Sequence, residues 1–153
     1  MVRVFVVYDT KYGNTKLVAE KIVEGLKEVE GIEAAISDVE GVDLDEVAGS
    51  DAVLIGSPNH VGRPARSITR FIDKLGKLGL KGKHVAVFDT YLAADFEKAT
   101  KKMEQRIKEK APSLKIIAPG LSIRVEGSEG PVAEGELPKS KEFGTRIAAQ
   151  LTK

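Results

Sequence analysis

Three stretches of the sequence are almost continuously apolar and have turn-forming residues at their ends: residues 2–8, 51–57 and 84–89. Runs of this length predict strands that are buried on both faces, as the strands of a parallel sheet are. Residues 32–37 form a shorter, half-polar run that is typical of a strand at the edge of a sheet. Pro119 and Gly120 divide a predicted last strand into residues 114–118 and 121–125.

Between the predicted strands, apolar residues recur every three or four positions with charged residues between them, which indicates amphipathic helices. The first of these helices precedes Gly31, a brief second one covers residues 44–47, and a third has Pro64 at its first position. A fourth, charged helix begins near Phe96, and Pro138 opens the last one. We predict that the inward-facing helical residues are Val18, Ile22, Leu26, Val29, Ile68, Phe71, Ile72, Leu75, Phe96, Ala99, Met103, Ile107, Phe143, Ile147 and Leu151.

Strands and helices therefore alternate along the whole chain, and no internal repeat is visible. This alternation predicts an α/β fold in which helices cover both faces of a parallel sheet. Because crossovers between parallel strands are right-handed, few topologies remain. The length of 153 residues is usual for one domain, so we expect residues 1–153 to form a single domain. The Gly-rich, acidic residues 126–137 are expected to form a surface loop.

Composition and charge exclude several classes of protein. The 24 basic and 23 acidic residues give a net charge of +1, which argues against nucleic acid and anionic membranes as partners. The apolar runs are too short to span a bilayer, and a chain without cysteine has no thiolate metal site or thiol nucleophile. We expect a cytoplasmic protein. Asn occurs only at positions 14 and 59, and Gln only at 105 and 150, a scarcity that favours a thermophilic source.

Ligands of open α/β sheets bind at the carboxyl ends of strands, where the strand order reverses. The first candidate loop runs from Asp9 to Thr15 and leads into a helix, whose free N–H groups and partial positive charge favour an anion. Thr10 and Thr15 add hydroxyl groups, and Gly13 allows close approach of a ligand or a positive φ. A plain turn capped by Asn14 or a threonine accounts for the same residues, so this loop alone leaves both interpretations open.

Two further loops follow the next buried strands. Residues 56–64 contain two glycines and two prolines, which indicates either a rigid connector or a ligand loop. His60 in this loop has no second histidine nearby, because His84 begins the following strand, so contact with a ligand ring is favoured over catalysis or metal binding. In the third loop, Tyr91 is suited to stacking on a flat ring, or it is an ordinary tyrosine at the edge of the core.

The three loops resemble those of the flavodoxin family. Residues 2–24 (VRVFVVYDTKYGNTKLVAEKIVE) resemble the flavodoxin phosphate loop, with Thr-x-x-Gly-Asn-Thr between strand and helix. Residues 52–73 (AVLIGSPNHVGRPARSITRFID) resemble the second flavin loop. Residues 81–91 (KGKHVAVFDTY) and 139–151 (KSKEFGTRIAAQL) are most similar to the flavodoxin domain of flavodiiron proteins. The resemblance implies a flavodoxin-like three-layer sandwich with a five-stranded parallel sheet of order 2-1-3-4-5, and FMN as the cofactor.

The resemblance also implies which residues bind FMN. The first loop would hold the phosphate through Thr10, Lys11, Tyr12, Gly13, Asn14 and Thr15. The second loop would lie along one side of the isoalloxazine ring through Pro58, Asn59, His60, Val61 and Gly62. The third loop would cover the other side of the ring through Thr90, Tyr91, Leu92 and Ala93. No catalytic residue and no metal ligand is implied.

A flavin held in this way implies an electron carrier that acts between redox partner proteins, either as a monomer or as a homodimer. Two other functions remain open: a small FMN-dependent NAD(P)H or quinone reductase, and a flavodoxin-like module that has lost FMN and acts in binding or regulation. The chain has no Trp, and His60 takes the position of the second-loop aromatic residue. Three basic residues lie near the proposed site: Lys11, Arg63 and Arg66. Their charge predicts a hydroquinone potential that is less negative than in acidic flavodoxins.

Overall fold

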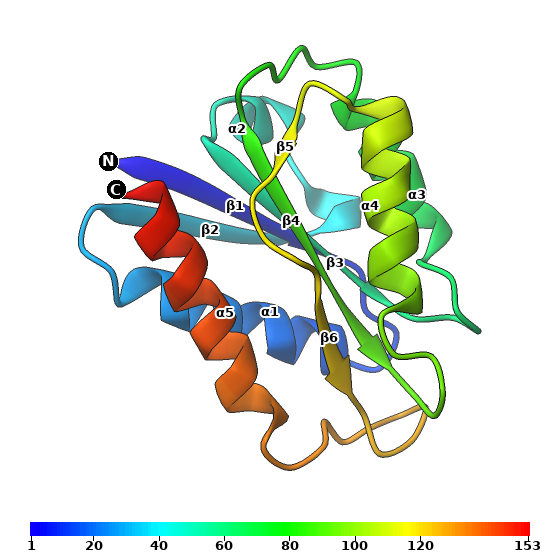
Figure 1. Cartoon of the computed structure of the whole chain (residues 1–153). Coiled ribbons are helices and arrows are strands. Elements are labelled where there is room, and N and C mark those ends of the chain that lie inside the picture. The colour runs from blue at the N-terminus through cyan, green and yellow to red at the C-terminus, as the bar shows by residue number, and fades with distance from the viewer.

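The apolar runs of the sequence form the strands of one parallel sheet (Figure 1). The computed structural model describes residues 1–153, and its strands are β1 (Val2–Tyr8), β2 (Ile32–Asp38), β3 (Ala52–Pro58), β4 (His84–Tyr91), β5 (Lys115–Ile116) and β6 (Leu121–Arg124). The strand order is β2-β1-β3-β4-β5, and β6 also pairs with β4. The predicted order and the predicted break in the last strand are both confirmed, because β5 and β6 pair with successive segments of β4.

Helices cover both faces of the sheet, as the alternating pattern predicts (Figure 1). They are α1 (Asn14–Lys27), α2 (Leu44–Ala48), α3 (Arg66–Leu75), α4 (Lys98–Lys110) and α5 (Glu136–Leu151), with a short 3-10 turn, η1 (Val39–Gly41). Helices α1 and α5 pack on one face and share a core with it, whereas α3 and α4 pack on the other. No helix combines the length and the apolar character needed to cross a bilayer.

The two faces of the central strands are both buried, which accounts for their continuous apolar runs. In β1, the side chains of Val4 and Val6 belong to the core beneath α1 and α5. The intervening Phe5 and Val7 belong to the core beneath α3 and α4. This alternation holds the strands in a fixed register and brings their carboxyl ends to one edge of the sheet.

Helices α1 and α5 cross in close contact through a pair of glycines. A Cβ atom added at Gly25 of α1 would lie 2.0 Å from the backbone oxygen of Lys141 in α5. A Cβ atom added at Gly144 of α5 would lie 2.1 Å from the backbone oxygen of Ile22 in α1. Neither position has room for a side chain, so this crossing fixes the place of α1 relative to α5.

Two predicted helix starts at proline are wrong. Helix α3 begins at Arg66, because Ala65 still has an extended backbone (ψ 146°) and Pro64 precedes it. Helix α5 begins at Glu136, two residues before Pro138, directly after a glycine with positive φ. Proline is tolerated throughout the first turn of a helix, where its missing N–H has no acceptor, so it does not fix the first residue.

The prediction that Phe96 faces the core from inside a helix is also wrong. Helix α4 begins only at Lys98, and Glu97 precedes it with a φ of 59°, a left-handed turn that the sequence does not indicate. The Phe96 side chain is 56% exposed and lies edge-on to Tyr91, with the ring centres 5.3 Å apart. Phe96 therefore extends the third loop and is not part of the helix.

Candidate functional site

The loops that follow β1, β3 and β4 meet at the carboxyl edge of the sheet and enclose a cavity of about 160 Å³. Eleven of the residues predicted for the site line this cavity: Thr10, Lys11, Tyr12, Asn14, Thr15, Pro58, Asn59, His60, Thr90, Tyr91 and Leu92. They come from segments far apart in the sequence, and the parallel register of the three strands brings them together. The cavity lies where the strand order reverses, between β1 and β3, the position at which α/β sheets bind ligands.

Four other predicted residues do not line the cavity. Gly13 contributes backbone only, at the start of α1. Val61 has a φ of 51° and a side chain that is 92% exposed, so it points into solvent. Gly62 lies against Lys98, and Ala93 is exposed at a φ of 60°. The second and third loops thus turn away from the cavity at these residues.

The first loop ends in a helix that no side chain caps. Gly13 is the N-cap residue of α1 with a φ of 93°, a conformation that L side chains rarely adopt. The hydroxyl of Thr10 accepts a hydrogen bond from the Gly13 N–H at 2.9 Å, and no side chain accepts from the first turn of the helix. The alternative of a plain turn in which Asn14 or a threonine caps the helix is therefore wrong, and the first N–H groups of α1 stay available to an anion.

A buried contact between two threonines joins the first loop to the third. The hydroxyl oxygens of Thr15 and Thr90 lie 3.0 Å apart, and both side chains are buried beneath the cavity. Asp9, at the start of the first loop, accepts from the Ser67 hydroxyl at 2.6 Å and thereby connects this loop to α3. These contacts hold the turn in place without using the N–H groups of α1.

Asn59 holds the second loop in its shape. Its side-chain carbonyl accepts from the Gly62 N–H at 2.7 Å, and its amide donates to the backbone oxygen of Asp95 at 2.9 Å. His60 and Arg63 exchange two backbone hydrogen bonds of 2.7 and 3.1 Å, which close a tight turn. The loop is therefore rigid, and it presents Pro58 and the exposed His60 to the cavity.

Sequence reasoning missed two residues of the lining, Val125 and Ser128. They belong to the loop after β6, which an isolated bridge between Val125 and Val132 folds back towards the site. Within this loop Gly130 packs closely on the first turn, since a Cβ atom added there would lie 2.6 Å from Asn14 Oδ1. The Gly-rich composition indicated a loop, but only the pairing of β6 with β4 reveals where it lies.

Two charged residues of the first and third loop regions, Lys11 and Asp89, differ in their surroundings. Lys11 is exposed, and its ammonium lies 5.4 Å from the centre of the Tyr12 ring. Asp89 is fully buried at the end of β4, where it accepts from the Ser122 hydroxyl at 2.5 Å and from the Thr100 N–H at 3.0 Å. Burial raises the pKa of the Asp89 carboxyl to about 6, because desolvation outweighs these two hydrogen bonds.

We expect Asp89→Asn to stabilise the protein above pH 7. The raised pKa means that protonated Asp89 favours the folded state, so its contribution is present below about pH 4 and is lost as the pH rises through 6. An asparagine carries no charge: its amide oxygen can accept from the Thr100 N–H, and its NH2 can donate to the Ser122 hydroxyl oxygen. The free energy of unfolding should rise by about 2 kcal/mol at pH 8. Urea unfolding at pH 4 and pH 8 measures this, and a variant that is less stable than the wild type at pH 8 contradicts it.

The arrangement suits a ligand with an anionic end and a flat body. The free N–H groups of α1 and the Thr10 hydroxyl lie at one end, and Pro58, His60 and Tyr91 provide flat or apolar surfaces at the other. A helix N-terminus with adjacent hydroxyl groups binds phosphate well, and tyrosine and proline pack against planar rings.

Comparison with known proteins agrees with this geometry. A family model described as a flavodoxin domain matches residues 5–124. The chain is 37% identical over 73 residues to a flavodoxin of Aquifex aeolicus, which covers 48% of the chain and 40% of that protein. It is 27% identical over 149 residues to the type A flavoprotein fprA of Rhodobacter capsulatus, covering 95% of the chain and 32% of that protein. An NAD(P)H dehydrogenase (quinone) of Geotalea daltonii is 33% identical over 104 residues, 52% of the chain and 51% of that protein.

Solved structures share the fold over the whole chain. A flavodoxin from the domain Archaea has a TM-score of 0.83 at 22% identity, covering 99% of this chain and 100% of that one. The rubredoxin oxygen:oxidoreductase of Desulfovibrio gigas has a TM-score of 0.81 at 17% identity, covering 98% of this chain but only 36% of that one. The chain thus spans about a third to a half of the length of the curated relatives it matches. The matched family model covers most of the chain, and the chain belongs to the flavodoxin family.

Proposed function

We propose that this protein binds FMN and carries electrons between redox partner proteins. The observation that supports the proposal most directly is the start of α1 at Gly13, where no side chain caps the helix. The first residues of this helix line the same cavity as His60 and Tyr91. Residues for the phosphate and for the ring are thus found side by side, as a flavin mononucleotide requires.

The residues present fit FMN. The N–H groups in the first turn of α1 and the hydroxyls of Thr10 and Thr15 would hold the phosphate, and Gly13 leaves the approach free, since no atom lies within 4 Å of a Cβ position there. Pro58 and His60 would lie along one side of the ring, and Tyr91 would lie along the other. The cavity of about 160 Å³ is smaller than a typical ligand pocket, so we expect part of the flavin to remain outside it.

FMN, when bound, supplies the one-electron and two-electron redox chemistry. The protein contributes binding, orientation and electrostatics. The Thr15–Thr90 contact and the Asn59 hydrogen bonds fix the three loops relative to one another, so that the ring would be held in one orientation. An exposed ring edge would let a partner protein approach closely enough to exchange electrons.

One observation favours a second candidate, an FMN-dependent NAD(P)H or quinone reductase. The chain is 33% identical over 104 residues to the NAD(P)H dehydrogenase (quinone) of Geotalea daltonii, although that stretch is only half of the relative. A reductase needs a second pocket beside the flavin for its nicotinamide or quinone substrate. The sequence contains no second nucleotide-binding motif, which favours the electron carrier.

Titration of the purified protein with FMN, followed by flavin fluorescence, tests the proposal. We expect quenching at one equivalent, and rapid oxidation of the reduced complex by the anionic one-electron acceptor ferricyanide. We also expect no steady-state oxidation of NADH or NADPH with quinones as acceptors. Turnover of NAD(P)H would support the reductase, and a lack of FMN binding would support a module that has lost its cofactor.

We expect Lys11→Gln to make the flavin potential more negative by roughly 20 to 40 mV. Reduction adds negative charge to the flavin, and the exposed Lys11 ammonium in the cavity lining would stabilise that charge. Potentiometric titration at low ionic strength measures the shift, and it should shrink in 0.5 M salt because of screening. Lys27→Gln, at the far end of α1, serves as the control, and an equal shift in both variants would contradict the assignment.

A further inference from the structure

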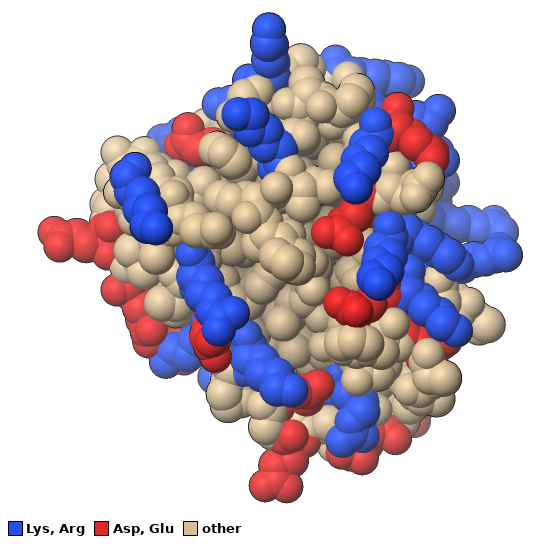
Figure 2. All heavy atoms as spheres, in the orientation of Figure 1, with Lys and Arg blue, Asp and Glu red and all other residues tan.

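A second and larger hollow, of about 830 Å³, lies between α3 and α4, beside the candidate flavin site. Glu109 is the one acidic residue that lines it. Six cationic side chains also line it: Arg63, Arg66, Lys98, Lys101, Lys102 and Arg106. We refer to it as the basic groove. The whole chain has a net charge of only +1, so this excess of positive charge is local. Figure 2 shows Lys and Arg side chains gathered on the side where Figure 1 has α3 and α4.

Half of these cations have acidic partners. Arg106 makes two hydrogen bonds of 2.7 Å to the Asp73 carboxylate, which hold α4 against α3. Lys98 and Lys101 lie 3.2 and 3.9 Å from acidic residues just before α4. The three others are exposed and form no ion pair: Arg63, Arg66 and Lys102. Three unpaired positive charges are therefore available to a ligand in the groove.

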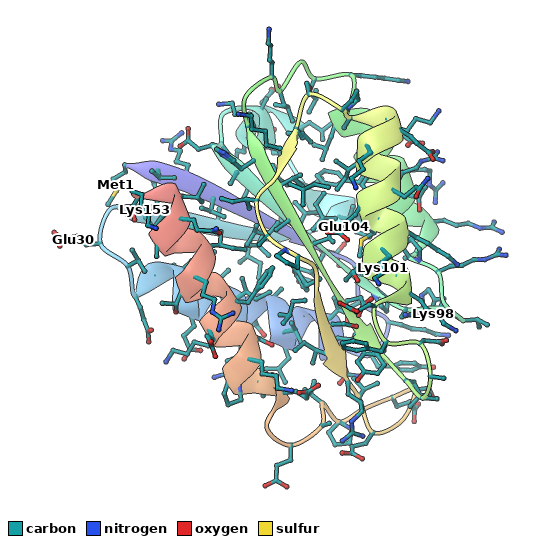
Figure 3. All side chains as sticks on the ribbon, in the orientation of Figure 1. Met1, Glu30, Lys98, Lys101, Glu104 and Lys153 are labelled. Atoms are coloured by element: carbon teal, nitrogen blue, oxygen red, sulfur yellow. The ribbon has the colours of Figure 1, made fainter.

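Helix α4 keeps one of its acidic residues away from this surface. In Figure 3, Glu104 points from α4 towards the crossing β5–β6 segment, one helical turn from Lys101. Its carboxylate is near the backbone of Gly120 and is partly buried. Glu104 therefore does not line the groove, although it is close enough to Lys101 to offset part of that charge.

The basic groove is continuous with the second loop of the flavin site. Two lysine side chains of α4 lie over Gly62. A Cβ atom built on Gly62 would lie 3.3 Å from Lys98 Cδ and 3.9 Å from Lys102 Nζ. Arg63, at the end of the groove, is bonded through its backbone to His60 in the cavity lining. A partner that sits in the groove would therefore lie directly beside the edge of the cavity.

We propose that the basic groove docks an acidic surface of a redox partner protein. Its relevance to electron transfer rests on the proposed function, but the docking itself depends only on charge complementarity. The acidic residues within and beside the groove, Glu109, Asp73 and Asp95, would repel a uniformly charged nucleic-acid backbone, whereas a protein surface can match a mixed pattern. The groove also has no aromatic side chain on which a base could stack.

Charge reversal in the groove tests the proposal. A fluorescently labelled plant-type [2Fe–2S] ferredoxin with a net negative charge serves as the probe, and its Kd is measured by anisotropy with apo and FMN-loaded protein. We expect Arg66→Glu/Lys102→Glu to weaken binding at least 10-fold at low ionic strength, and we expect 0.3 M salt to weaken binding to the wild type. Lys81→Glu/Lys115→Glu makes the same change in net charge at the opposite end of the sheet and should stay within twofold of the wild type.

The outcomes separate the two proposals. Equal ferredoxin affinity in both double variants, or no measurable binding to the wild type, overturns the docking surface. Tighter binding of a DNA duplex at the same salt concentration, lost in the Arg66/Lys102 variant, overturns it as well, because the groove would then be a nucleic-acid site. FMN affinity is measured in every variant. If the wild type binds ferredoxin but not FMN, the docking surface is supported and the electron carrier is refuted. If it binds FMN but not ferredoxin, the electron carrier is supported and the docking surface is refuted.

Discussion

Thr10→Ala/Thr15→Ala is expected to weaken FMN binding about 100-fold or more. A hydrogen bond to a charged group contributes about 1.5 to 3 kcal/mol, and each hydroxyl in the cavity lining would donate one to the phosphate. The Thr10 hydroxyl also accepts from the Gly13 N–H, so its loss loosens the turn that presents the helix. Flavin fluorescence titration of the double variant measures the change in Kd.

Two further variants make this result specific. Thr10→Ser/Thr15→Ser keeps both hydroxyls and should bind FMN within a few-fold of the wild type. Thr69→Ala/Thr152→Ala removes two hydroxyls that bond to the backbone oxygens of Ala65 and Ala148, away from the cavity, and should leave the affinity unchanged. If Thr10→Ala/Thr15→Ala binds FMN like this control, the phosphate is held elsewhere or by backbone groups alone.

Gly144→Ala is expected to lower the free energy of unfolding by at least about 3 kcal/mol. The added methyl group would lie 2.1 Å from the backbone oxygen of Ile22, and backbone atoms cannot give way as the end of a side chain can. Helices α1 and α5 must then separate and lose close packing along their crossing. Because α1 carries the phosphate turn, FMN affinity should fall as well. Chemical denaturation at pH 7 measures the loss of stability.

Gly41→Ala is the matched control for this substitution. Gly41 has no atom within 4 Å of a Cβ position and does not have a positive φ, so alanine fits there without strain. We expect its free energy of unfolding to stay within about 0.5 kcal/mol of the wild type, as for most surface substitutions. Equal stability of the Gly144 and Gly41 variants would show that the helix crossing adapts to a side chain.

Much of the fold could be predicted because its strands are buried on both faces. In β1 every residue from Val4 to Tyr8 is buried, so the apolar pattern of this run is unambiguous. Helix boundaries were predicted less well, because they depend on backbone angles that composition does not reveal. The left-handed conformation of Glu97 is an example, since it moves the start of α4 beyond Phe96.

The candidate site could be predicted where it follows strand ends, and not where it depends on long-range contacts. The turn around Gly13 has a local signal, because a glycine between a strand and a helix allows both positive φ and close approach. The contact between Thr15 and Thr90 has no local signal, since the two residues meet only through the register of the sheet. Val125 and Ser128 were missed for the same reason.

The central claim is that the turn between β1 and α1 receives the phosphate of FMN. Amide chemical shifts measured by NMR during titration of the ¹⁵N-labelled protein, with FMN and separately with riboflavin, test it most directly. We predict that FMN shifts the amides of Gly13, Asn14 and Thr15 strongly, and that riboflavin, which lacks the phosphate, leaves them nearly unchanged. Saturable FMN binding that leaves these three amides in place would contradict the account.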